Sequence, residues 1–155
     1  DFINKGSNRY QIKPKNSFDE ITGQKVLMEY FSSGDTFNLA LYTNTATIDA
    51  STTAYSTGLG GQVSASGTGY ALGGKPLVSA TPTLDGSVAI CDFTAPVSWS
   101  AATITARGCL IYNASAGGDK AVCVLNFGGD KTATAGTFTI DFPAAAAATA
   151  IIQLA

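Results

Sequence analysis

The sequence predicts a mainly β protein: a single β-sandwich or jelly-roll-like domain with an N-terminal arm and one candidate short helix. Short runs rich in Val, Ile, Thr and aromatic residues recur from Thr36 onward, and clusters of Gly, Asp, Ser and Asn separate them. These runs do not alternate with long helical patterns, so a parallel nucleotide-binding sheet is not expected. The chain has 155 residues, which is enough to bury the core of one domain without disulfides or metals.

The N-terminal region differs from the rest of the chain. Residues 1–16 mix basic and apolar side chains, and we expect them to form an arm in front of a domain that spans residues 17–155. Ser17 and Glu20 have the spacing of a helix capping box, so residues 18–31 are the candidate helix. Residues 25–31 (KVLMEYF) are equally compatible with a first strand, because this segment fits both periodicities.

Seven to nine strands are expected after this region. The clearest alternates Phe37, Leu39 and Leu41 with the opposite face. Glycines at 67–69 and 73–74 predict turns, and the segments SAGGD (115–119) and GGD (128–130) resemble hairpin connections. Residues 43–58 are polar and almost uncharged, which is typical of an exposed loop or of a protein–protein contact. The expected strands cover residues 37–43, 62–66, 70–72, 75–80, 87–93, 102–113, 120–127, 136–142 and 150–154.

Composition excludes several classes of protein. Charged residues make up 13% of the chain and the net charge is −2, so neither a charge-rich disordered chain nor a strongly basic nucleic-acid-binding protein is expected. The chain has no His, which removes the commonest general base, and its acids show no paired or metal-binding spacing. We therefore expect no enzyme, no metal and no cofactor. No apolar run reaches the roughly 18 residues of a membrane helix, so no membrane partner is expected.

The three cysteines point to a reducing environment. Cys91, Cys109 and Cys123 lie in apolar, strand-like segments and form no CxxC pair. We expect each to be a buried thiol that packs as a small hydrophobic residue. An odd number of cysteines and the lack of a visible signal peptide favour synthesis and assembly in a cytosol.

Several conspicuous side chains have structural interpretations. Asp85, Asp119 and Asp130 lie beside glycines, so we expect them in turns, where their carboxylates accept hydrogen bonds from nearby backbone N–H groups. Trp99 stands alone in the sequence and is expected in the core or at an interface rather than in a ligand platform.

Arg107 is the most informative charged residue of the β region. It is followed by Gly108 within a strong strand pattern, which predicts a bulge or a close approach of two backbones. An acid such as Asp92 or Asp141 is its expected partner. The alternative is a partner on another molecule.

Four segments resemble a known family. They are LALYTNTATIDASTTAY (39–55), QVSASGTGYALGGKPL (62–77), TITARGCLIYN (103–113) and AVCVLNFGGDKTATAGTFTIDFP (121–143). Their order resembles that in small virion structural proteins of tailed bacteriophages, which typically carry an acid where this chain has Gln62. The resemblance implies a β-rich, non-enzymatic component of the virus particle. A capsid decoration (cement) protein is the first interpretation, and a tail- or fibre-associated receptor- or glycan-binding module is the alternative.

A decoration protein would bind the major capsid protein on the outer capsid surface and stabilise the joints between capsomers. It would be synthesised in the host cytoplasm and would follow the local capsid symmetry, as a trimer or a dimer of itself. The basic arm is its expected anchor, because apolar side chains alternate there with positive charges that suit an acidic shell. The candidate residues for contact with the capsid or with another subunit are Phe2, Ile3, Lys5, Arg9, Tyr10, Ile12, Lys13, Lys15 and Arg107.

Overall fold

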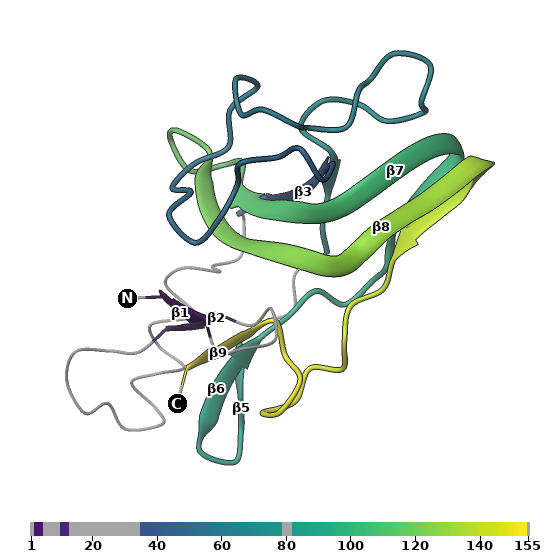
Figure 1. The fold of residues 1–155 in the computed structure, drawn as a ribbon. Coiled ribbons are helices and arrows are strands. Elements are labelled where there is room, and N and C mark those ends of the chain that lie inside the picture. Colours follow the sequence, from purple (N-terminus) through teal and green to yellow (C-terminus); the bar gives the residue numbers. More distant parts are fainter. Residues whose placement is uncertain (1, 5–9, 13–34, 79–81, 155) are drawn as a thin grey trace. The chain divides into compact units, whose positions relative to one another are not determined.

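A computed structural model of the chain describes residues 2–4, 10–12, 35–78 and 82–154 (Figure 1). The described residues form strands, turns and loops without a helix, which confirms the mainly β prediction. They group into two compact units. The hairpin unit contains residues 36–77 and 96–140, and the terminal unit contains the described residues of 1–35, 78–95 and 141–155. The single domain over residues 17–155 stays a prediction, and the candidate helix at 18–31 lies outside the described residues.

The hairpin unit is an antiparallel sheet of four strands in the order β4-β3-β7-β8. β7 and β8 form one long hairpin around the predicted turn at residues 115–119, and they are the two longest ribbons in Figure 1. Along β7, only the second half, from Gly108 to Asn113, pairs with β3. The bounds are β3 (Phe37–Tyr42), β4 (Lys75–Pro76), β7 (Val97–Asn113) and β8 (Lys120–Ile140).

Burial along β7 follows its neighbours. From Val97 to Ala106, buried and exposed side chains alternate, as in a strand with one covered face. A bulge at Ala101, where φ is 49°, adds one exposed residue to this pattern. From Gly108 to Tyr112 every residue is buried, because β3 and β8 flank this part on both edges and loop residues cover its face.

β8 contains a large bulge at the place where the sequence predicted a hairpin turn. Ala106 pairs with Lys131 and Gly108 pairs with Asn126, so Arg107 alone faces residues 127–130 of β8. Gly128 has a positive φ of 75°, which a glycine adopts without steric cost. The predicted hairpin connection at 128–130 is therefore wrong. The chain continues in the same direction, and the strands expected at 120–127 and 136–142 are the two ends of β8.

The segment between β3 and β4 is a long loop. The strands predicted at 62–66 and 70–72 do not form, and a single bridge between Tyr42 and Gln62 replaces them. The loop is instead attached to β3 by two hydrogen bonds at Leu41. Its carbonyl accepts from Val63 N at 2.9 Å, and its N–H donates to Tyr70 Oη at 3.0 Å. β4 occupies only the start of the predicted strand 75–80, which extends into undescribed residues at 79–81.

The terminal unit is a sheet of five strands in the order β1-β2-β9-β6-β5. All neighbours are antiparallel except β2 and β9, which run parallel. Two segments of the predicted arm thus lie in a sheet with the C-terminal strand. β6 and β9 confirm the strands predicted at 87–93 and 150–154, and β5 was not predicted. The bounds are β1 (Phe2–Asn4), β2 (Tyr10–Ile12), β5 (Thr83–Asp85), β6 (Val88–Cys91) and β9 (Ile152–Leu154).

Two carboxylates attach the C-terminal region of this unit. Asp92 is 1% exposed; its Oδ1 accepts from Phe93 N at 2.8 Å and its Oδ2 accepts from Ile151 N at 3.3 Å. Burial raises the pKa of Asp92, and the two backbone hydrogen bonds partly oppose that change. Asp85 Oδ2 accepts from Ala147 N at 2.6 Å. The expected hydrogen bond from a nearby backbone N–H is therefore wrong for Asp85. Its carboxylate accepts from Ala147, which is far away in sequence.

Replacing Gly108 with Ala should destabilise the protein by about 2 kcal/mol or more. The added Cβ would overlap the backbone carbonyl oxygen of Leu125, which cannot move without breaking the pairing of β7 with β8. Gly129→Ala is the matched control, because its Cβ would enter open space, and it should change stability by less than about 0.5 kcal/mol. Urea unfolding of both variants measures this difference. Equal stabilities would contradict the close approach.

The pKa of Asp92 predicts a specific pH dependence. Because the carboxyl pKa is higher in the folded than in the unfolded chain, its contribution favours folding below the ordinary aspartate pKa and is lost as pH rises through the raised value. Asp92→Asn is neutral at every pH, so the variant should lose less stability than the wild type across that interval. Urea unfolding of both proteins between about pH 3.5 and 7 measures the difference. Parallel pH profiles would contradict it.

Candidate interaction site at the bulge of β8

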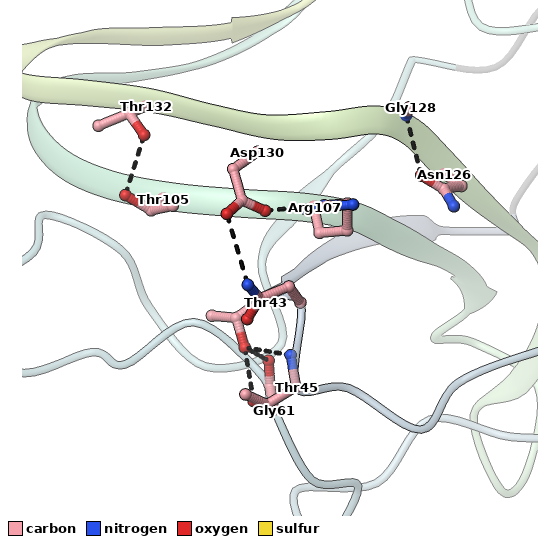
Figure 2. Close-up of polar contacts among 10 residues, drawn as sticks. Thr43, Thr45, Gly61, Thr105, Arg107, Asn126, Gly128, Asp130 and Thr132 are labelled. Atoms are coloured by element: carbon pink, nitrogen blue, oxygen red, sulfur yellow. Dashed lines mark hydrogen bonds and ion pairs between the residues drawn. The ribbon is translucent and has the colours of Figure 1, made fainter.

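The bulge of β8 brings three polar side chains together on the hairpin unit. Figure 2 labels two of them, Arg107 and Asp130. Arg107 Nε on β7 donates a hydrogen bond to Asp130 Oδ1 at 2.7 Å. Asn44 Nδ2, from the loop after β3, donates to Asp130 Oδ2 at 3.5 Å. Asp130 thus binds one side chain from a strand and one from a loop. We call Arg107, Asp130 and Asn44 the bulge cluster.

Hydrogen bonds fix the backbone on the β8 side of the cluster. Asn126 Oδ1 accepts from Gly128 N at 2.8 Å, which closes the bulge on itself (Figure 2). Across from it, Gly108 brings β7 so close to Leu125 that no larger residue fits. The backbone is therefore held in place on β7, next to Arg107, and on β8, opposite it.

The loop that carries Asn44 is fixed in the same way. Thr43 N donates to Gly61 O at 2.8 Å, and Thr43 Oγ1 lies 3.0 Å from the same carbonyl and 2.9 Å from Thr45 Oγ1 (Figure 2). These contacts close the loop at the residues on either side of Asn44. The amide of Asn44 is thus held next to Asp130.

The ion pair of the cluster is open to water. The Arg107 side chain is 41% exposed and that of Asp130 is 39% exposed. An ion pair in such a position contributes at most about 1 kcal/mol to folding, because water and salt screen it. The ion pair affects the position of Arg107 more than it affects stability. The 2.7 Å contact between Arg107 Nε and Asp130 Oδ1 limits where the guanidinium group can lie.

Most donors of Arg107 remain unused. A guanidinium group has five N–H donors, one on Nε and four on the two Nη atoms. Within the part of the chain that the structure describes, only Nε has a partner. The two Nη groups can therefore bind an acceptor supplied from outside the described residues.

Paired hydroxyl groups lie at exposed positions along β7 and β8. Thr105 Oγ1 lies 3.0 Å from Thr132 Oγ1, and Ser98 Oγ lies 2.8 Å from Thr139 Oγ1. All four residues are exposed. Their short side chains lose little conformational entropy when another protein covers them.

The tyrosines of the hairpin unit form a second cluster, which is structural. Tyr55 stacks on Tyr112 with ring centroids 4.4 Å apart, and Tyr55 Oη and Tyr70 Oη are bridged by Gln62. Burial raises the pKa of Tyr70 to about 12, and it also raises the pKa of Tyr42. Tyr42 and Tyr70 are therefore harder to deprotonate than a free phenol, and both are buried.

Trp99 and the cysteines belong to the cores, as predicted. Trp99 is 1% exposed and packs near Tyr70. Cys91, Cys109 and Cys123 are buried thiols. Burial raises the pKa of Cys91 to about 12 and also raises the pKa of Cys109, so neither is a reactive thiolate near neutral pH.

Of the two alternatives predicted at Arg107, the close backbone approach is confirmed at Gly108. The bulge lies opposite Arg107, because its extra residues 127–130 are on β8. The expected pairing with Asp92 or Asp141 is wrong, because Asp130 is the partner. Asp130 was expected in a hairpin turn at GGD, and Asn44 was not singled out, so neither was predicted beside Arg107. An interpretation as a bulge would have placed Asp130 opposite Arg107. Asp119, by contrast, does lie in its predicted turn, with a φ of 46°.

The other described candidate residues belong to the terminal unit, whereas Arg107 belongs to the hairpin unit. Phe2 and Ile3 lie in β1, and Tyr10 and Ile12 lie in β2, both in the terminal unit. The four basic residues of the predicted arm lie outside the described residues; they are Lys5, Arg9, Lys13 and Lys15.

The described part of the chain has neither a cluster of metal-binding side chains nor a membrane-spanning helix. Nowhere in it do three His, Cys, Asp or Glu side chains gather closely enough to hold a metal ion. It also contains no helix with the length and apolar character needed to span a membrane.

Comparison with known proteins adds no relative. No protein-family model matches the chain, and no curated protein or solved structure is significantly similar to it. The structural observations on which a function can be proposed are the two β units and the bulge cluster.

Proposed function

We propose that this protein is a structural component of a tailed-bacteriophage virion, a capsid decoration protein that binds the outer capsid surface and stabilises joints between capsomers. One observation carries the proposal. The four segments that resemble small virion proteins are separate in sequence, yet nearly all of their residues belong to the hairpin unit, on β3, its following loop, β4, β7 and β8. The resemblance thus follows one compact structural unit rather than scattered turns.

The surface of the hairpin unit suits a mechanical role. A decoration protein needs a firm body and a face that can cover another protein at low entropic cost. The paired hydroxyls of Thr105 with Thr132 and of Ser98 with Thr139 supply such a face. Area buried across a joint between capsomers adds to the free energy needed to separate them, and no chemical step is required.

The proposal includes the assembly and the setting of the protein. Its partners are the major capsid protein and further copies of itself, as a trimer or a dimer that obeys the local symmetry of the shell. Assembly takes place in the host cytoplasm, with which the buried thiols of Cys91, Cys109 and Cys123 are compatible. The β-sandwich or jelly-roll arrangement of the domain is part of the same proposal.

Quantitative mass spectrometry of purified virions tests the location. We expect a copy number near one per major capsid subunit, or near one per three subunits, because a decoration protein repeats with the shell. A ratio near one per hundred would contradict the capsid role and favour a tail or fibre component that binds a receptor or glycan. Absence from the particle would contradict any virion role.

Removing the charge of the arm should weaken capsid attachment. Replacing Lys5, Arg9, Lys13 and Lys15 together with Ala removes the basic residues of the predicted anchor. We expect about tenfold weaker binding at low salt, since several exposed charge contacts of a few tenths of a kcal/mol each are lost. Binding to capsids that lack the protein, measured at low and high salt, gives the affinity.

The control for this variant exchanges Lys and Arg at the same four positions, which keeps the charge. It should bind as the wild type does. Equal occupancy of the wild type and the Ala variant at every salt concentration would show that the arm is not the anchor.

A further inference from the structure

We propose that Arg107 is a receptor for a carboxylate side chain of the partner protein, and that Asp130 holds its guanidinium group in the orientation that this recognition needs. The inference rests on the proposed capsid role, because it names the chemistry by which the hairpin unit would recognise the shell. The partner group is an Asp or Glu on the surface of the capsid protein.

The Nη donors of Arg107 are available to a partner protein. Nε is already bonded to Asp130 Oδ1 at 2.7 Å, and within the described residues the Nη atoms have no partner. The two Nη groups of a guanidinium can donate parallel hydrogen bonds to the two oxygens of one carboxylate. Such a pair is more directional than a contact with a lysine ammonium group.

The side chain of Arg107 is restricted before a partner binds. An arginine side chain loses about 2 kcal/mol of conformational freedom when it is immobilised. Here the short contact with Asp130 has already restricted the side chain, and Asn44 occupies the second oxygen of that carboxylate. The bulge and Gly108 fix the backbone beneath. Arg107 has therefore lost part of its conformational freedom before binding, which lowers the entropic cost of association.

The formal charges of the cluster balance. Asp130 neutralises the positive charge of Arg107. Lys131, the next residue of β8, pairs with the buried Ala106 and so points to the opposite face of the sheet from Arg107. The cluster therefore carries no excess positive charge, and binding of one carboxylate depends on the directional Nη hydrogen bonds rather than on net charge. From residue 30 onward the chain carries seven acids against four basic residues, so a nucleic-acid backbone, which needs many cations, does not fit this surface.

Strand addition does not suit the bulge. β8 is an edge strand, and an exposed edge can pair with a strand of another chain. At residues 127–130, however, the N–H of Gly128 donates to Asn126 Oδ1, and the bulge interrupts the regular ladder that a second strand would require. At this part of the edge, side-chain recognition through Arg107 suits the geometry better than strand pairing.

The test measures the affinity of purified protein for capsids that lack it, with three variants whose folding is checked by circular dichroism and thermal unfolding. Arg107→Lys keeps the charge and loses the paired Nη donors, and it should bind about tenfold more weakly or worse. Lys131→Ala removes a neighbouring charge without touching the cluster, and it should bind within about threefold of the wild type.

Asp130→Ala separates orientation from simple attraction. Removing this acid makes the surface more positive, so attraction alone would strengthen binding to an acidic partner. Loss of the held geometry should instead weaken binding, by about threefold to tenfold, because one rotamer-rich side chain must now be ordered on association.

The outcomes separate this inference from the proposed function. If the wild type binds and Arg107→Lys binds equally well, the carboxylate receptor is disproved while the capsid role stands. Tighter binding by Asp130→Ala would overturn the orienting role of that residue. If the wild type itself does not bind capsids, the proposed function fails, and this inference fails with it.

Discussion

The antiparallel pairing of β7 with β8 is the interaction on which the rest of the hairpin unit depends. It joins residues 97–113 to residues 120–140, but its register shifts at four places. Neighbouring residues of a strand point to opposite faces of the sheet. Each register shift therefore changes which residues of β7 and β8 share a face. The positions of Trp99 in the core and of Arg107 on the surface both follow from these shifts.

The long loop after β3 depends on the same hairpin. β3 pairs only with the second half of β7, so the first half has one edge without a strand. The loop meets that edge, where Thr103 N donates to Thr68 O at 2.9 Å. Its apolar residues, including Ile48 and Tyr55, pack on Tyr42 and Tyr112. The loop thus covers part of the sheet. Ile48 and Tyr55 are partly buried for this reason, although they belong to no strand.

The sequence predicted features that depend on local pattern and missed those that depend on distant pairing. Alternation identified β3, and the SAGGD turn was correctly placed. A glycine pair, however, allows both a hairpin turn and a bulge, and local sequence does not distinguish them. The partner strand decides, because residues 127–130 face Arg107 while β8 continues on both sides. The same limit explains the wrong partner for Arg107 and the unexpected bond from Ala147 to Asp85.

Stability does not explain why the bulge holds an ion pair. Backbone hydrogen bonds of a regular ladder contribute about 1 kcal/mol each, and the bulge at residues 127–130 gives some of them up. The pair gained in return, Arg107 with Asp130, is open to water on both side chains and returns no more than about 1 kcal/mol. A regular strand would serve the core at least as well. What the bulge adds is position: it places a carboxylate beside Nε and leaves the Nη groups unpaired within the described chain, which is the arrangement that binding an external acid requires.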